Sequence, residues 1–251
     1  MKLERAQMHP STFFYFIIIM AFTVIPVYAD DTTCQSTNIS CIQSSIATET
    51  TNITEPRWKN QSYRDLAVSI AFAGDIDGAI DYIKKIDNSD TQAMTVRAIG
   101  MALAIHKDLP VEQYRTIFKK LNDFTPTIID EGARDIAYTY IAMAQAFAGL
   151  DDDAHTTTLV MKKDALKHKA YGETAEIQAE RGDFTRAMFS INAIDSVSFK
   201  NKALGIVSAI FLKAGDIDHA YQTAIQITNS TKKTNALQKI VNAQIGLDAP
   251  K

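Results

Sequence analysis

The pattern of apolar and polar residues between positions 63 and 87 predicts a helix, a tight turn and a second helix. Apolar side chains recur there at three- and four-residue steps, which places them on one face of each helix. The two stripes consist of Leu66, Ala67, Ile70 and Ala71, and of Ala79, Tyr82, Ile83 and Ile86. Between them, Gly74 suits a left-handed helix end, and the Asp75 carboxylate suits the start of the next helix.

This arrangement recurs along the chain at a constant step in the numbering, which is 33. The columns that keep this step include Gly149, Gly182 and Gly215, then Ala154, Ala187 and Ala220, then Ala137, Ala170, Ala203 and Ala236. Such a period is typical of stacked helical repeats, because a single unit cannot bury its apolar face alone. No alternating apolar runs joined by Asn-Gly or Asp-Gly turns compete with this interpretation.

We therefore predict an all-α fold, an α-solenoid of about five helix-turn-helix repeats within residues 61–251 and about eleven helices in all. The second unit is irregular. Residues 106–108 occupy its turn, and about nine extra residues enter between Val111 and Arg134, around residues 125–127. A final amphipathic stretch, residues 234–246, is expected to form a single capping helix.

The start of the chain, residues 1–60, predicts export followed by a spacer. Lys2 and Arg5 precede a nearly continuous apolar run over residues 13–27, and Ala29 ends a small-residue cleavage pattern. These features predict a signal peptide over residues 1–29 and a secreted or periplasmic protein without a membrane span after cleavage. An uncleaved anchor is the alternative. Residues 30–60 are rich in Ser, Thr and Asn, which predicts a flexible leader.

The two cysteines of the chain, Cys34 and Cys41, follow the predicted cleavage site. In an oxidising compartment we expect them to form a disulfide. Their spacing is not that of a Cys-x-x-Cys redox motif, so the expected role is local stabilisation.

The composition and the motifs of the chain give little indication of a catalytic or ligand-binding site. The chain has 251 residues, 22% charged, and a formal net charge of −3, whereas a general nucleic-acid binder would be basic. No His-Glu-x-x-His motif, Cys/His cluster or phosphate-binding glycine loop is present in the sequence. We therefore expect no catalytic residue, no metal site and no cofactor. We interpret Asp151 to Asp153 as acidic residues that stabilise the N-terminus of a helix. We interpret Arg181-Gly182-Asp183 as residues of a repeat turn.

The turn and second-helix residues carry a family resemblance. The turn and second helix of a tetratricopeptide repeat are similar to residues 74–82, 182–187 and 215–220 of this chain. The first helices also have small residues at the positions where that family has them. Those small residues are Ala67, Gly100, Ala142, Ala175 and Ser208. The chain departs from that family in its period of 33 rather than 34 and in lacking the proline that ends each unit. A HEAT-like helical array is the alternative.

The resemblance implies a concave face built from the first helices that holds an extended peptide. The peptide-binding residues that it implies are Arg64, Arg97, Met101, Thr139, Met143, Lys169 and Lys202, with Val68, Glu176 and Ala209 beside them. The cations would clamp carboxylates, and the methionines would give adaptable apolar contact.

The sequence thus predicts a non-enzymatic, exported scaffold that binds a protein or peptide partner. Two alternatives remain at this point. One is an accessory domain or a cryptic hydrolase of the cell envelope, and the other is an assembly subunit that packs by its edges.

Overall fold

The computed structural model describes residues 34–247. Within this range the chain forms twelve α-helices and one 3₁₀ turn, and the described residues contain no strand, so the predicted all-α class is confirmed. The elements are α1 Ile39–Asn52, α2 Pro56–Phe72, α3 Ile76–Ile83, α4 Ser89–His106, α5 Val111–Phe124, η1 Thr125–Thr127, α6 Glu131–Phe147, α7 Asp151–Leu159, α8 Asp164–Glu180, α9 Phe184–Asn192, α10 Val197–Lys213, α11 Ile217–Ala224 and α12 Ser230–Gln244.

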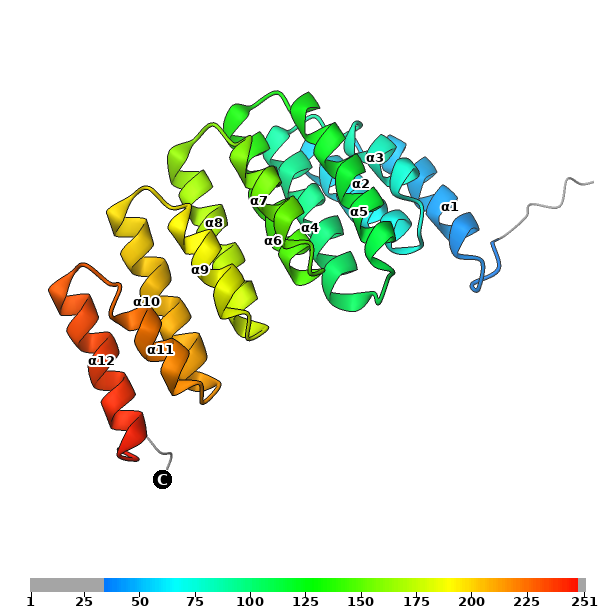
Figure 1. Cartoon of the computed structure of the whole chain (residues 1–251). Helices are drawn as coiled ribbons and strands as arrows, with labels where there is room; N and C mark the ends of the chain where they lie inside the picture. The colour runs from blue at the N-terminus through cyan, green and yellow to red at the C-terminus, as the bar shows by residue number, and fades with distance from the viewer. Residues whose placement is uncertain (1–33, 248–251) are drawn as a thin grey trace, which may run out of the picture.

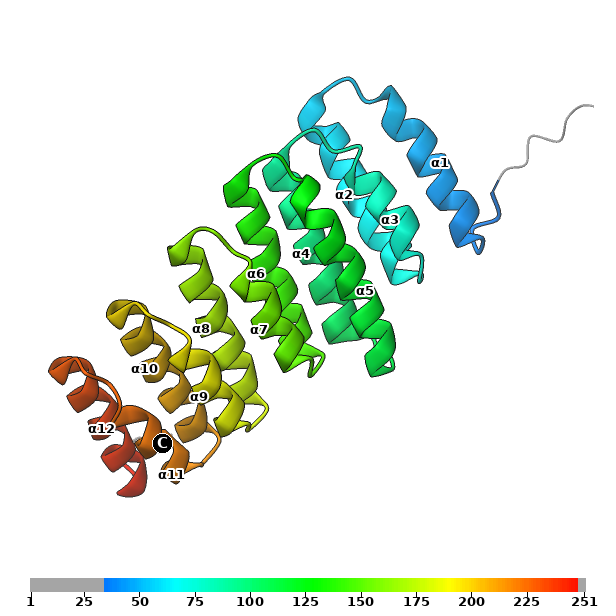
Figure 2. The same ribbon diagram turned by 45° about the horizontal axis from the view of Figure 1, so that its top comes forward.

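The helices form an open row of antiparallel pairs (Figures 1 and 2). The long helices α2, α4, α6, α8, α10 and α12 pack side by side in one layer. The shorter helices lie in the other layer, where α3, α7, α9 and α11 each pack against the long helix that precedes them and α5 packs chiefly against α6 and α3. The long helices begin at positions 56, 89, 131, 164, 197 and 230, so the successive steps in the numbering are 33, 42, 33, 33 and 33.

The turns within the pairs follow the expected chemistry. Gly74, Gly149, Gly182 and Gly215 have φ angles of 107°, 76°, 80° and 81°, the left-handed region that glycine adopts without steric cost. Three of these turns end in an aspartate whose side chain accepts from the third residue of the following helix, namely Asp75, Asp183 and Asp216. The glycine and aspartate assignments are therefore confirmed at these positions.

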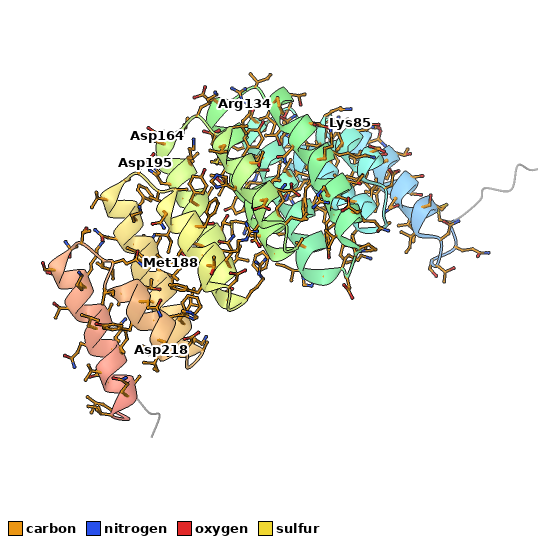
Figure 3. All side chains as sticks on the ribbon, in the orientation of Figure 1. Lys85, Arg134, Asp164, Met188, Asp195 and Asp218 are labelled. Carbon is orange, nitrogen blue, oxygen red and sulfur yellow. A yellow bond between two sulfur atoms is a disulfide. The ribbon has the colours of Figure 1, made fainter. Side chains whose placement is uncertain are left out.

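Small side chains set the closest approach between the two layers. Ala79, Ala154, Ala187 and Ala220 are fully buried, and each lies on a short helix. On the partner helices, Ala67, Ala142 and Ala175 are buried in the same clusters, while Ser208 donates a hydrogen bond to the carbonyl of Ala220 at 2.9 Å. Larger side chains complete these clusters, as Met188 of α9 does in the cluster that also holds Ala175 and Ala187 (Figure 3).

The irregular second unit lies at α5. This helix has 14 residues, whereas α3, α7, α9 and α11 have 8 or 9. Its buried stripe is Tyr114, Phe118, Leu121 and Phe124, which recurs at helical steps and holds the longer helix against α6 and α3. The extra residues predicted here therefore lengthen α5 and form η1.

The predicted flexible leader, residues 30–60, is wrong over its described part. Helix α1 covers most of it, and α2 begins at Pro56, before the predicted start. The Asn38 side chain accepts from the Cys41 N–H, and Glu55 accepts from the N–H groups of Arg57 and Trp58, so both helices begin with a cap. Helix α1 packs against α2, where Thr50 is buried and its hydroxyl lies 2.6 Å from that of Ser62.

Cys34 and Cys41 are joined by a disulfide, with their Cα atoms 5.6 Å apart. The bond closes the loop that leads into α1. The predicted signal peptide, residues 1–29, lies outside the described residues. Among the helices that the structure describes, none combines the length and the apolar character needed to cross a membrane.

Candidate functional site

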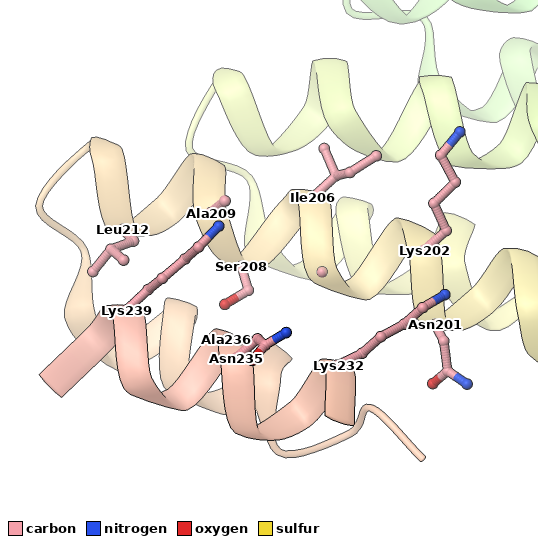
Figure 4. Close-up of a pocket in the computed structure, with 11 residues that line it drawn as sticks. Asn201, Lys202, Ile206, Ser208, Ala209, Leu212, Lys232, Asn235, Ala236 and Lys239 are labelled. Atoms are coloured by element: carbon pink, nitrogen blue, oxygen red, sulfur yellow. The ribbon is translucent and has the colours of Figure 1, made fainter. Parts of the chain in front are cut away.

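A cavity of about 300 Å³ opens between α10 and α12, in the layer of long helices (Figure 4). Its floor is apolar and includes Ile206, Ala209 and Leu212 of α10 and Ala236 of α12. Lys202, Lys232 and Lys239 also line it. Figure 4 shows Lys232 and Lys239 extending from α12 toward α10.

Helical periodicity explains why these side chains share one cavity. Lys202, Ile206 and Ala209 follow one another at four- and three-residue steps along α10, while Leu204, Val207 and Phe211 are buried against the rest of the molecule. On α12 the same stepping brings Lys232, Asn235 or Ala236, and Lys239 to one face. Two stripes of matched spacing therefore face each other across the cavity.

The two helices that form this cavity are strongly basic. Together α10 and α12 carry six lysines, which are Lys200, Lys202, Lys213, Lys232, Lys233 and Lys239, and neither helix contains Asp or Glu. Among the described residues, none of these six lysines belongs to an ion pair. The region is thus locally cationic within a chain whose formal net charge is −3.

A second, smaller hollow of about 30 Å³ continues from this cavity toward α8 and shares Lys202 and Ile206 with it. Lys169, Glu173 and Glu176 of α8 line its other side. Burial raises the pKa of the Glu176 carboxyl, the neighbouring Glu173 carboxylate raises it further, and the Lys202 ammonium opposes both effects. The surface therefore changes from basic over α10 and α12 to mixed charge over α8.

The structure places the predicted binding residues in different surroundings. Lys169 and Lys202 line adjoining hollows, as described above. The Arg97 guanidinium lies 4.6 Å from the centroid of the Tyr140 ring on α6, so α4 and α6 already hold it through a cation–π contact. Met101 and Met143 are half-buried and pack against the core clusters. Arg64, on α2, is half-buried.

The prediction that Thr139 faces the groove is wrong. This side chain is only 2% exposed, and its hydroxyl donates to the Asp135 carbonyl of the preceding helical turn at 2.8 Å. A threonine can enter the interior in this way because its own helix satisfies the hydroxyl. The seven predicted residues lie on α2, α4, α6, α8 and α10, which are consecutive helices of the long layer, and Lys169 and Lys202 line a common hollow.

Sequence reasoning missed Lys232, Asn235 and Lys239, because α12 was interpreted only as a cap. The available signal was the charge pattern. Two lysines seven residues apart lie on one face of a helix that has no acidic residue to pair with them. Ile206, which joins the two hollows, carried no distinctive signal in the sequence.

A cleft of about 280 Å³, lined by polar and charged residues, lies elsewhere, between α5 and α7. Its charged groups are largely paired, with the Arg115 Nε 3.1 Å from an Asp153 carboxylate oxygen. Gln145 of α6 lines the cleft, and its buried Oε1 atom has no hydrogen-bond partner among the described residues. The same holds for Oδ1 of Asn122.

The acidic run at the start of α7 is engaged by arginines. Asp151 pairs with Arg181 at 2.7 Å, Asp152 with Arg186, and Asp153 with Arg115. No group of three or more His, Cys, Asp or Glu side chains suited to a metal ion is present in residues 34–247. Arg181 thus forms an ion pair, Gly182 forms the turn, and Asp183 caps the helix that follows.

No protein-family model matches the chain, and no curated protein matches it. Among solved structures, it is similar to the crystal structure of Ton1535 from Thermococcus onnurineus NA1, at 16% sequence identity and a TM-score of 0.37. The similar region covers 75% of this chain and 60% of that one, so the chain spans less than two thirds of that protein's length. A similarity at this level supports no conclusion about function.

Proposed function

We propose that the protein is a non-enzymatic scaffold that binds an extended segment of a partner protein or peptide on its layer of long helices. The observation that carries the proposal is the open cavity of about 300 Å³ between α10 and α12. It combines an apolar floor, which rewards burial of a partner side chain, with polar and charged groups at its edge that fix orientation.

The regular spacing of the elements supports a helical repeat scaffold. Four of the five steps between the starts of successive long helices are equal, at 33 in the numbering. In such arrays each unit packs mainly on its neighbours, and the side chains that face outward from one layer form a continuous binding surface. The adjoining hollows over α8, α10 and α12 have this arrangement, since they share Lys202 and Ile206.

Export belongs to the same proposal. The apolar run over residues 13–27 and the small residue Ala29 support a cleaved signal. The Cys34–Cys41 disulfide is compatible with an oxidising compartment. Amino-terminal sequencing of the mature chain from its native cell is expected to begin at Asp30, and a chain that retains Met1 would contradict cleavage.

Site-specific photocrosslinking tests the binding face. A photoreactive phenylalanine derivative is placed at Ala209, which lines the cavity, and as the matched control at Gln222, an exposed residue of the opposite layer on α11. Both variants are expressed in the native cell and irradiated. The proposal expects a discrete crosslinked partner from position 209 and none from position 222. Equal crosslinking from both positions, or none from either, contradicts it.

A further inference from the structure

We infer that the partner segment held between α10 and α12 is acidic, with carboxylates spaced three residues apart around an apolar residue. This inference rests on the proposed function, since it names the chemistry of the occupant of the same cavity. The evidence is the charge of the two helices, the spacing of their lysines and the position of the acidic residues of α8.

Charge complementarity identifies the class of partner. Six lysines lie on α10 and α12, no carboxylate side chain lies on either helix, and the whole chain is nevertheless acidic, with a formal net charge of −3. Lysines on an exposed surface repel one another, so a carboxylate brought among them relieves repulsion and gains attraction. The gain is screened by salt, because the ammonium groups remain near solvent.

The geometry of α12 gives the spacing. Lys232 and Lys239 lie seven residues apart on one face, which corresponds to about 10 Å along a helix that rises about 1.5 Å per residue. A polyproline II segment advances about 3.1 Å per residue with three residues per turn, so two carboxylates separated by three positions share one face and span about the same distance. Between them the apolar floor at Ile206, Ala209 and Ala236 receives a side chain such as leucine.

The acidic residues of α8 bound the site. Glu173 and Glu176 lie on the far side of Lys202 from α12. They repel further carboxylates and neutralise part of the Lys202 charge. The acidic part of the partner therefore lies over α10 and α12, where the charged residues that line the cavity are all lysines, rather than over the mixed charges of α8.

The test uses two fluorescein-labelled octapeptides and fluorescence anisotropy with the full mature chain. The first peptide has two glutamates three positions apart with a leucine between them, and the second has glutamines in place of the glutamates. We expect the glutamate peptide to bind at least tenfold more tightly at 50 mM NaCl, and this difference to shrink at 300 mM.

Two double variants provide the matched comparison. Lys202→Glu with Lys239→Glu reverses two charges that line the cavity, one on each helix. Lys213→Glu with Lys233→Glu makes the same change of charge on the same helices outside the lining. We expect the first variant to lower the affinity for the glutamate peptide at least tenfold, and the second to lower it less than threefold. Circular dichroism of both variants verifies that the helices remain folded.

The outcomes separate this inference from the proposed function. If the two peptides bind equally, or if the two variants weaken binding of the glutamate peptide equally, the inference that the partner is acidic is wrong. If neither peptide binds but Ala209 crosslinks a partner in the cell, the acidic inference fails and the proposed function stands. If neither peptide binds and position 209 gives no crosslink, both fail.

Discussion

The helix pairs α6–α7 and α8–α9 have the same backbone frame and different polar interiors. Their long helices each have 17 residues, and their short helices each have 9. Gln145 and Gln178 occupy the same position in the two long helices, and both are buried. Gln178 donates to Asp151 at 2.8 Å and accepts from the Ser190 hydroxyl at 2.8 Å, whereas the Gln145 Oε1 has no partner among the described residues.

The helix starts differ in a complementary way. In the first pair, Asp130 caps α6 while α7 begins after Leu150 without a side-chain cap. In the second pair, α8 begins after Lys163 without such a cap, and Asp183 caps α9. Both pairs nevertheless share the buried small residues of their interface, Ala142 with Ala154 and Ala175 with Ala187. The frame therefore depends on glycine, alanine and the apolar stripes, and polar contacts can vary within it.

The largest expected difference between the pairs comes from the two glutamines. Gln178→Met leaves the Ser190 hydroxyl and one Asp151 oxygen without this partner, and we expect it to lower the free energy of unfolding by about 2–3 kcal/mol. Gln145→Met removes a buried oxygen that has no partner among the described residues, and we expect a gain of up to about 1 kcal/mol. Urea unfolding of both variants measures the difference. Equal losses would show that the two sites are equivalent.

A smaller difference is expected at the start of the short helices. Asp183→Ala gives α9 the uncapped start that α7 already has, because it removes the carboxylate that accepts from the Arg186 N–H at 3.0 Å. We expect a loss of about 1 kcal/mol in the free energy of unfolding. Asp183→Asn keeps an acceptor and serves as the control, with a change below about 0.5 kcal/mol. If Asp183→Asn lowered the free energy of unfolding as much as Asp183→Ala does, the effect would come from the charge rather than from capping.

The smallest effect concerns His155 of α7, which corresponds in position to Met188 of α9. Burial lowers the pKa of His155, the Asp152 carboxylate opposes this effect, and the Lys167 ammonium adds to it. The unfolded chain then takes up a proton near pH 6.5 that folded His155 does not, so stability decreases as the pH falls through this range. We expect His155→Met to reduce the loss of stability between about pH 7 and pH 5. Thermal unfolding at several pH values measures it, and an unchanged slope would contradict the prediction.

Much of the fold could be predicted because its determinants are local. Gly182 and Asp183 are residue types that predict the turn and the helix cap directly. The small side chains of Ala175 and Ala187 predict where α8 and α9 approach most closely. Helix α1 could not be predicted in the same way, because Ser and Thr dominate its sequence and hydrogen-bond within the helix, as Thr48 does to the Ser44 carbonyl.

The candidate site was less predictable. Lys169 and Lys202 were identified through the family resemblance, but a residue such as Thr139 can point outward or bond to its own helix, and its spacing does not distinguish the two. Lys232 and Lys239 lie on a different helix from Lys202, so their approach depends on how α12 packs against α10. That packing is a tertiary property which no local pattern in α12 specifies.

The open row of pairs has a mechanical consequence. Within the described part of the chain, the principal contacts join helices that are neighbours in the row. A pulling force applied at residues 34 and 247 would then be carried by each junction in series. The molecule should extend as a spring at low load and yield in successive steps, with each detached pair releasing its own length of chain.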